Sequence, residues 1–235
     1  RGGNAGDAKA RVARAEGGVG LSYIEFTSVH PSSLCGGPVS WDDSIIDGCR
    51  ALMDAIRPYG MKMFHQLEHG GFMYPPIDGS PGWSASATPH PLTGAVSVAM
   101  TRGQIAEIVQ AVGAAARRAC EAGLDGVEIH CGHGYLLHQF MSPLTNQRED
   151  DYGGSLDNRL RLTREVLRAV RSRVEPGFPI GIRLSDQLAP GGLTAADCAE
   201  IAGRLEAEGL IDFINGSQGS YHALPAMLPA MERPT

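Results

Sequence analysis

The feature that most limits the possible folds is a regular alternation of strand-like and helix-like segments. Five short apolar runs bounded by turn residues are typical of strands, at 20–30, 61–69, 126–130, 179–184 and 211–216. Apolar residues at three- and four-residue spacing predict helices over 42–58, 101–122, 158–174 and 194–208, and a short helix is expected over 7–17. This alternation predicts a parallel α/β sheet.

The long connections mostly follow strands and precede helices. A connection as long as 70–100 is typical of a functional lid or a small excursion, and 131–157 is expected to be another long loop. Active-site loops follow the strands in a TIM (β/α)8 barrel. The rival fold, a doubly wound open sheet, normally carries a Gly-rich phosphate-binding pattern that this sequence lacks. We therefore expect one partial TIM-barrel domain over 1–235, with about strands 2–6 present.

Composition excludes several classes of function. The formal charge of 20 − 26 = −6, with no basic cluster, argues against binding nucleic acid or an anionic membrane. No apolar run approaches the roughly 18 residues of a spanning helix, and the start shows no secretory signal pattern. The five cysteines are far apart and form no C-x-x-C pair, so we expect reduced thiols in a cytoplasmic protein. They are Cys35, Cys49, Cys120, Cys131 and Cys198.

The densest polar cluster follows the strand at 126–130. It contains His130, His133 and Tyr135, with two glycines that let the backbone turn sharply. Two imidazoles at a strand exit are placed to polarise one carbonyl oxygen, and a phenol can donate a proton to carbon. The alternatives are a buried structural histidine beside a surface one, or metal binding by the two histidines. No third ligand stands at a typical spacing, so we expect no metal.

Two further polar side chains lie within predicted strands. Gln66 carries both donors and an acceptor, so it can bind the edge of a heterocycle, although a surface position is as probable from the residue alone. Arg183 lies in an apolar strand and must be paired when buried. Its partner is either a structural carboxylate or negative charge on a ligand.

Long segments of the chain resemble the old yellow enzyme family of FMN-dependent oxidoreductases. The segment GLDGVEIHCGHGYLLHQFMSPLTNQREDDYGGSLDNR at 123–159 is similar to the signature of that family. The strand MKMFHQLEHGG at 61–71, PIGIRLS with the following PGGLTAAD, and IDFINGSQGSYHALPAM at 211–227 resemble further parts of it. The closest branch contains 2,4-dienoyl-CoA reductase and trimethylamine dehydrogenase.

The resemblance implies a role for each candidate residue. Gln66 would bind the pyrimidine edge of FMN, and Arg183 would stabilise the reduced, anionic ring. His130 and His133 would hold a carbonyl oxygen, and Tyr135 would protonate the neighbouring carbon. NADH or NADPH would supply the hydride, and the protein would supply orientation and charge.

The resemblance also has departures and gaps. His222 stands near a second catalytic histidine of the dienoyl-CoA reductase branch, but only with a gap in the alignment. Phe72 replaces an arginine that usually ends the Q-L-x-H-x-G-R strand. The first barrel strand would lie before Arg1. The last two strands, the phosphate-binding loops and any iron–sulfur cluster would lie beyond Thr235. For the chain alone we expect an open barrel, low stability and weak FMN retention.

Three functions are compatible with the sequence. The first is hydride transfer between NAD(P)H, flavin and an activated C=C bond of an enoate, enone or dienoyl substrate. The second is flavin-dependent oxidative N-demethylation of a small methylated amine, which an aromatic cage of Trp41, Tyr74 and Trp83 would favour. The third is a binding module without catalysis. The sequence leaves the substrate and the oligomeric state open.

Overall fold

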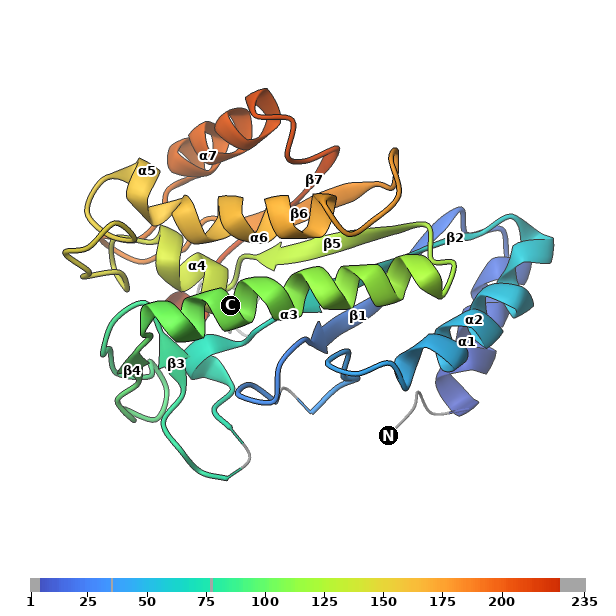
Figure 1. Ribbon diagram of the computed structural model, residues 1–235, viewed down its shortest axis with the longest axis horizontal. Coiled ribbons are helices and arrows are strands. Elements are labelled where there is room, and N and C mark those ends of the chain that lie inside the picture. Colours follow the sequence, from blue (N-terminus) through green and yellow to red (C-terminus); the bar gives the residue numbers. More distant parts are fainter. Residues whose placement is uncertain (1–4, 35, 77, 225–235) are drawn as a thin grey trace, which may run out of the picture.

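The computed structural model describes residues 5–34, 36–76 and 78–224. Its centre is a parallel sheet of five strands in the order β1-β2-β5-β6-β7 (Figure 1). These strands are β1 (Leu21–Ser28), β2 (Lys62–Glu68), β5 (Gly126–Cys131), β6 (Ile180–Ser185) and β7 (Phe213–Ser217). All five predicted strands are present, and each pairs in parallel with its neighbour along the chain, as in a partial TIM barrel.

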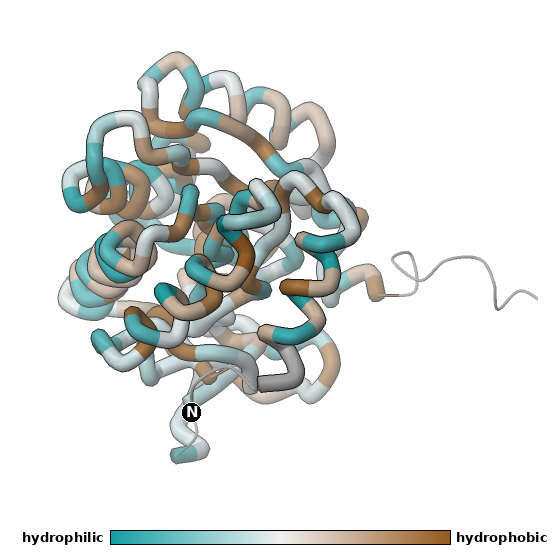
Figure 2. The backbone as a smooth tube through the Cα atoms, turned by 90° about the vertical axis from the view of Figure 1, so that its right-hand side faces the viewer, coloured by the Kyte–Doolittle hydropathy of each residue, from teal (hydrophilic) through white to brown (hydrophobic). Residues whose placement is uncertain are grey.

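The main helices lie together on one face of the sheet (Figure 1). They are α2 (Ile45–Ile56), α3 (Arg102–Glu121), α6 (Arg161–Arg171) and α7 (Ala195–Ala207); α1 (Ala5–Glu16) packs beside α2. Hydrophobic and hydrophilic positions alternate around their turns (Figure 2). Apolar residues of the central strands, such as Val127 and Ile182, are fully buried on this side. The amphipathic spacing seen in the sequence therefore corresponds to this strand–helix core.

The other face of the sheet has an aromatic layer near the amino ends of the strands. The rings of Phe64 and Phe213 lie 5.3 Å apart, and Tyr23 meets Phe64 edge-on. A Cβ atom on Gly126 would lie 2.8 Å from the Phe64 ring, and one on Gly181 would lie 2.3 Å from the Phe213 ring. Glycine is therefore required at both positions, because any side chain would displace an aromatic ring.

Both long connections contain short secondary-structure elements, and one of them differs from the sequence prediction. Residues 70–100 form the expected excursion, which contains η2 (Gly71–Met73) and a short parallel pair, β3 (Trp83–Ser84) and β4 (Val98–Ala99). The region 131–157, predicted to be a loop, contains the buried helix α4 (Leu136–Met141). The helix predicted over 158–174 begins earlier, as α5 (Leu156–Arg159), and continues as α6. Short 3-10 turns occur at η1 (Arg57–Tyr59) and η3 (Tyr221–Ala223).

Two expectations drawn from composition concern the cysteine thiols and membrane-spanning helices. Cys49, Cys120, Cys131 and Cys198 are free thiols, and Cys35 lies outside the described residues. Within the described ranges, no helix is both long and apolar enough to cross a membrane.

Candidate functional site

The predicted site residues meet in one cavity at the carboxyl end of the sheet. The cavity has a volume of about 320 Å³. Its lining consists of Tyr23, Glu25, Phe26, Gln66, His130, His133, Tyr135 and Arg183. All five candidate residues belong to this lining, so side chains from separate strands share one space.

The alternation of side chains along the strands explains this convergence. On β5, Glu128 and His130 point away from the helices, while Val127 and Ile129 are buried against them. The parallel register places Gln66 of β2 opposite Glu128, and Arg183 of β6 opposite His130. Polar residues at alternate positions of neighbouring strands therefore lie side by side on one face of the sheet, closer to the carboxyl ends of the strands than the aromatic layer.

His130 and His133 contact each other instead of converging on one point. The backbone N–H of Gly132 donates to Nδ1 of His130 at 3.2 Å, so the proton of this neutral ring lies on Nε2. Nε2 of His130 donates to Nδ1 of His133 at 3.2 Å, and Nε2 of His133 donates to Oγ of Ser217 at 2.7 Å. The expected pair of donors aimed at one oxygen is therefore not assembled here.

Burial keeps both imidazoles neutral. Loss of hydration lowers the pKa of His130 well below its usual value, and His133 and Arg183 lower it further. The pKa of His133 is also lowered, mainly by burial and then by Arg183. Both rings are therefore neutral N–H donors near pH 7, suited to a carbonyl oxygen.

A sharp backbone turn brings Tyr135 back toward the strands. His133 and Gly134 both have positive φ angles, 57° and 85°, and Gly134 donates its N–H to Nδ1 of His138 at 2.6 Å. Histidine is one of the few side-chain-bearing residues found at such angles. The turn ends at the start of α4, with the rings of His130 and Tyr135 4.7 Å apart.

The phenol of Tyr135 belongs to a group of three tyrosines. Its hydroxyl lies 3.4 Å from those of Tyr74 and Tyr221. Burial raises the pKa of Tyr135, and hydrogen bonding to Tyr221 and then to Tyr74 raises it further. The group therefore carries its proton at neutral pH, as a proton donor must.

The sequence prediction missed Glu128, a fully buried carboxylate bonded to two residues of the cavity lining. Its Oε1 accepts from Nε2 of Gln66 at 2.5 Å and from Nε of Arg183 at 2.8 Å. Its Oε2 accepts from Nδ2 of Asn215 at 2.9 Å. A glutamate inside an otherwise apolar strand was the available signal, because a buried carboxylate requires partners on adjacent strands. Arg183 thus has the structural carboxylate that the sequence left as one alternative.

The polar atoms left free in the cavity fit the pyrimidine end of a flavin. Among the described residues, the two terminal nitrogens of Arg183 and Oε1 of Gln66 have no hydrogen-bond partner. A guanidinium offers donors to a ring carbonyl and to negative charge at the neighbouring nitrogen, and an amide oxygen accepts from a ring N–H. This donor and acceptor set is the one that the family resemblance implies for FMN.

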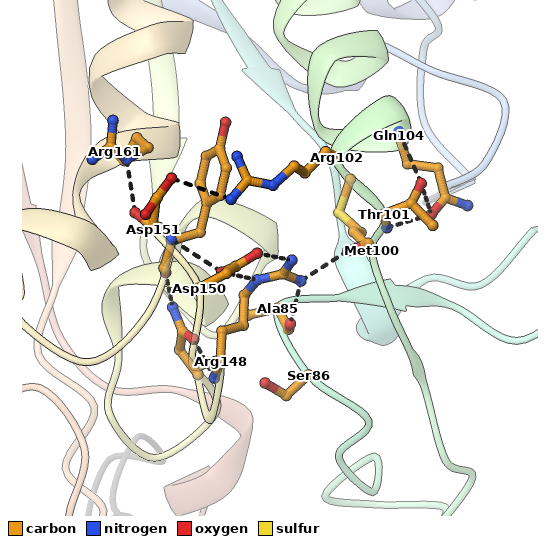
Figure 3. Close-up of polar contacts among 12 residues, drawn as sticks. Ala85, Ser86, Met100, Thr101, Arg102, Gln104, Arg148, Asp150, Asp151 and Arg161 are labelled. Atoms are coloured by element: carbon orange, nitrogen blue, oxygen red, sulfur yellow. Dashed lines mark hydrogen bonds and ion pairs between the residues drawn. The ribbon is translucent and has the colours of Figure 1, made fainter.

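A second polar network supports the loop after α4 at some distance from the cavity (Figure 3). Nη1 of Arg148 donates to the carbonyl oxygens of Ala85 at 3.0 Å and Met100 at 2.8 Å. Its Nε and Nη2 donate to both carboxylate oxygens of Asp150. Arg148 therefore fastens the 70–100 excursion to the following loop, and the charged run at 142–162 has this structural role.

The remaining predicted residues lie around the cavity without lining it. His222 faces Gln187, with 3.3 Å between Nδ1 and the amide nitrogen, and packs edge-on against Phe72. Trp83 stacks on His69 and lies tilted against His30, and the ring of Tyr74 lies tilted against that of Tyr135. Trp41, Tyr74 and Trp83 are all absent from the cavity lining, so the aromatic cage that would favour the amine alternative does not form around it.

Metal binding has no support from the arrangement of ligands. His130 and His133 use their nitrogens on each other, on Gly132 and on Ser217. In the part of the chain that the structure describes, no group of three His, Cys, Asp or Glu residues is placed to hold a metal ion.

Comparisons with known proteins agree with the geometry. The chain matches the NADH:flavin oxidoreductase / NADH oxidase family over residues 5–226. It is 41% identical over 216 residues to an NADPH dehydrogenase of Bacillus licheniformis, covering 89% of this chain and 61% of that protein. A solved 2-naphthoyl-CoA reductase is similar with a TM-score of 0.85 and 29% identity, over 92% of this chain and 35% of the other. An old yellow enzyme homologue from Zymomonas mobilis is similar with a TM-score of 0.78 and 27% identity, over 91% and 64%.

These comparisons confirm the predicted family, the TIM-barrel fold, and FMN with NADH or NADPH as the cofactors of the family. The chain spans about three fifths of the length of the Bacillus NADPH dehydrogenase. The matched residues include the whole cavity described above. The chain belongs to the NADH:flavin oxidoreductase / NADH oxidase family, the family of the old yellow enzymes.

Proposed function

We propose that this protein reduces an activated C=C bond, in an enone, enoate or dienoyl compound, with NADH or NADPH as electron source. The observation that carries the proposal is the convergence of Gln66, Arg183, His130, His133 and Tyr135 on one cavity. FMN, when bound, supplies the hydride transfer between the nicotinamide and the substrate. The similarity to a 2-naphthoyl-CoA reductase, whose name identifies a conjugated acyl compound, supports the same class of substrate.

The chain's own side chains have separate roles in this reaction. Gln66 and Arg183 hold the pyrimidine end of the cofactor through the amide oxygen and the terminal guanidinium nitrogens. The neutral N–H groups of His130 and His133 donate to the substrate carbonyl oxygen, which withdraws electron density from the alkene. Tyr135 donates its phenolic proton to the carbon next to that carbonyl, and the hydride goes to the other alkene carbon.

This assignment of donors requires a local change on substrate binding. In the structure, the proton on Nε2 of His130 is directed at His133, and that of His133 at Ser217. A carbonyl oxygen that enters the cavity must replace these acceptors. Catalytic hydrogen bonds often form fully only when the substrate is bound.

Oxidative N-demethylation has less support from this site. The cage of Trp41, Tyr74 and Trp83 on which that alternative depended does not surround the cavity. The histidine pair favours an oxygen ligand over a cationic amine. A binding module without catalysis would have no need for a buried proton donor beside two neutral imidazoles.

The experiment has two anaerobic arms. The purified protein is reduced by NADH or by NADPH and then mixed with an enone, and the oxidised protein is separately mixed with a methylated amine. We expect reoxidation by the enone. In Tyr135→Phe, flavin reduction should continue at the parent rate, and alkene reduction should slow by roughly a hundredfold or more. An unchanged alkene rate in this variant would refute the role of Tyr135. Reduction of the oxidised flavin by the methylated amine, with no reoxidation of the reduced flavin by the enone, would refute the substrate class.

A further inference from the structure

A buried polar network next to the cavity joins one side chain from every strand of the sheet. Glu128 of β5 accepts hydrogen bonds from Gln66 of β2, Arg183 of β6 and Asn215 of β7. Tyr23 of β1 faces the same carboxylate, which raises its pKa in addition to burial. Glu128 itself is fully buried. Two residues proposed to bind the cofactor, Gln66 and Arg183, therefore share one buried carboxylate.

This carboxylate determines which atoms of its partners reach the cavity. Because Nε of Arg183 is bonded to Glu128, the two terminal nitrogens of the guanidinium are turned to the open side. Because Nε2 of Gln66 donates to the same Oε1, the amide oxygen is turned away from Glu128. Removal of Glu128 would leave both side chains free to rotate.

Glu128 also changes the charge that a ligand meets. Arg183 is three quarters buried in its side chain and forms its ion pair with Glu128 at 2.8 Å. Because Glu128 is fully buried and in direct contact, its charge offsets part of the charge of Arg183, so a bound anion meets less than a full positive charge. Reduction of a flavin places negative charge at its pyrimidine end, the end facing Arg183.

We propose that Glu128 is a positioning residue that orients Gln66 and Arg183 and, by offsetting the charge of Arg183, keeps the reduction potential of the bound flavin low. The inference rests on the proposed place of the cofactor beside Gln66 and Arg183. It does not depend on which compound finally accepts the hydride.

The test compares the affinities for oxidised and for reduced FMN, together with the midpoint potential, in the purified protein and its variants. In Glu128→Gln the offsetting charge is gone, so reduced FMN should gain at least tenfold in affinity relative to oxidised FMN. For a two-electron couple this corresponds to a positive shift of about 30 mV. Glu128→Asp retains the charge. Its affinity ratio, which is the affinity for reduced FMN divided by that for oxidised FMN, should stay within threefold of the parent. Glu206→Gln, the same substitution on the exposed side of α7, is the matched control and should change nothing.

A double variant keeps the test decisive if Glu128→Gln does not fold. Glu128→Gln combined with Arg183→Gln removes both charges, so no unpaired charge remains where the ion pair was. We expect its affinity ratio to stay within threefold of the parent. A tenfold loss for reduced FMN would mean that Arg183 acts without an offset, and would overturn the inference.

The outcomes separate this inference from the proposed function. A folded, flavin-loaded Glu128→Gln protein with an unchanged affinity ratio would overturn the inference even where enone reduction is intact. A shifted ratio in a protein that reduces no enone would support the inference and refute the proposed substrate class. A loss of stability in Glu128→Gln without a change in the ratio would assign Glu128 to the fold alone.

Discussion

The Nε2 atom of His130 lies 3.2 Å from the Nδ1 atom of His133, so the two imidazoles form a hydrogen-bonded pair. The pair ends on the hydroxyl of Ser217, 2.7 Å from the second ring. The hydrogen bonds all run in one direction, from the backbone N–H of Gly132 through both rings to Ser217 of β7. An oxygen ligand has to compete with this internal chain for the same protons.

Ser217→Ala removes the acceptor that competes for the proton of His133. One neutral hydrogen bond contributes about 0.5–1.5 kcal/mol, so we expect the apparent affinity for an enone to rise roughly two- to tenfold. Steady-state kinetics over a range of enone concentrations measures this effect. Ser172→Ala, at the exposed end of α6, is the control. Weaker enone binding in Ser217→Ala would show instead that Ser217 holds His133 in its working orientation.

Acid should destabilise the fold through its buried histidines, which include three besides His130. Burial lowers the pKa of His65 to about 4 and that of His69 and His138 to about 3, against 6.5 for an unfolded chain. The unfolded state therefore binds more protons below pH 6.5, and stability falls as the pH drops from 6.5 to about 4. Each ring contributes about 1.4 kcal/mol per pH unit well inside this window. Urea unfolding at a series of pH values measures the slope.

His138→Asn isolates one of these contributions. Nδ1 of His138 accepts the N–H of Gly134, and the asparagine oxygen can take the same place without titrating. As the pH falls below 6.5, the free energy of unfolding of the variant should then decline less steeply than that of the parent, by about 1.4 kcal/mol per pH unit. Above pH 6.5 the substitution should leave the pH dependence unchanged. An identical slope in the variant would mean that His138 is not buried in its neutral form.

Arg148→Ala should weaken the attachment of the 70–100 excursion. It leaves the buried carbonyl oxygens of Ala85 and Met100 without their donor and Asp150 without its cation. We expect a loss of about 2–4 kcal/mol in the free energy of unfolding, with faster proteolysis inside the excursion. Arg102→Ala removes an exposed ion pair with Asp151 and should change stability by less than about 1 kcal/mol. Equal losses in both variants would contradict the structural role of Arg148.

Gly181→Ala should disturb the aromatic layer. The added Cβ atom would lie 2.3 Å from the ring of Phe213, so the ring must move at a cost of about 1–3 kcal/mol. Combining it with Phe213→Leu should recover part of the loss, since the smaller side chain leaves room. Gly203→Ala, on the exposed side of α7 with no atom within 4 Å, should instead stabilise by about 0.5–1 kcal/mol. Thermal unfolding of the four proteins distinguishes these effects.

The sequence was sufficient to predict the five strands because each has a strong local signal. Turn residues bound every run, and the helices between them have clear amphipathic spacing. Helix α4 was missed because its six residues are all buried, so it shows no polar face and no periodicity. The short pair β3 and β4 depends on contacts between residues about 15 apart, which local patterns do not encode.

The candidate site was predictable where chemistry and position coincide. His130, His133 and Tyr135 follow a strand directly, and Gln66 and Arg183 stand out as polar residues in strands. Glu128 had a signal of its own, as a glutamate in an apolar strand, but Asn215 could be assigned as its partner only once the register of the strands was known. The direction of the His130–His133 hydrogen bond also depends on a backbone N–H that no sequence pattern reveals.

The cavity takes its lining from two kinds of segment. Gln66 and Arg183 stand on strands, whereas Tyr135 stands on the connection after β5, with Tyr74 and Tyr221 of two further connections beside it. The residues proposed to hold the cofactor are therefore on strands, whereas the tyrosine group is on the connecting segments. Diversification of this scaffold toward new compounds should accordingly change residues of the connecting segments and keep those of the strands.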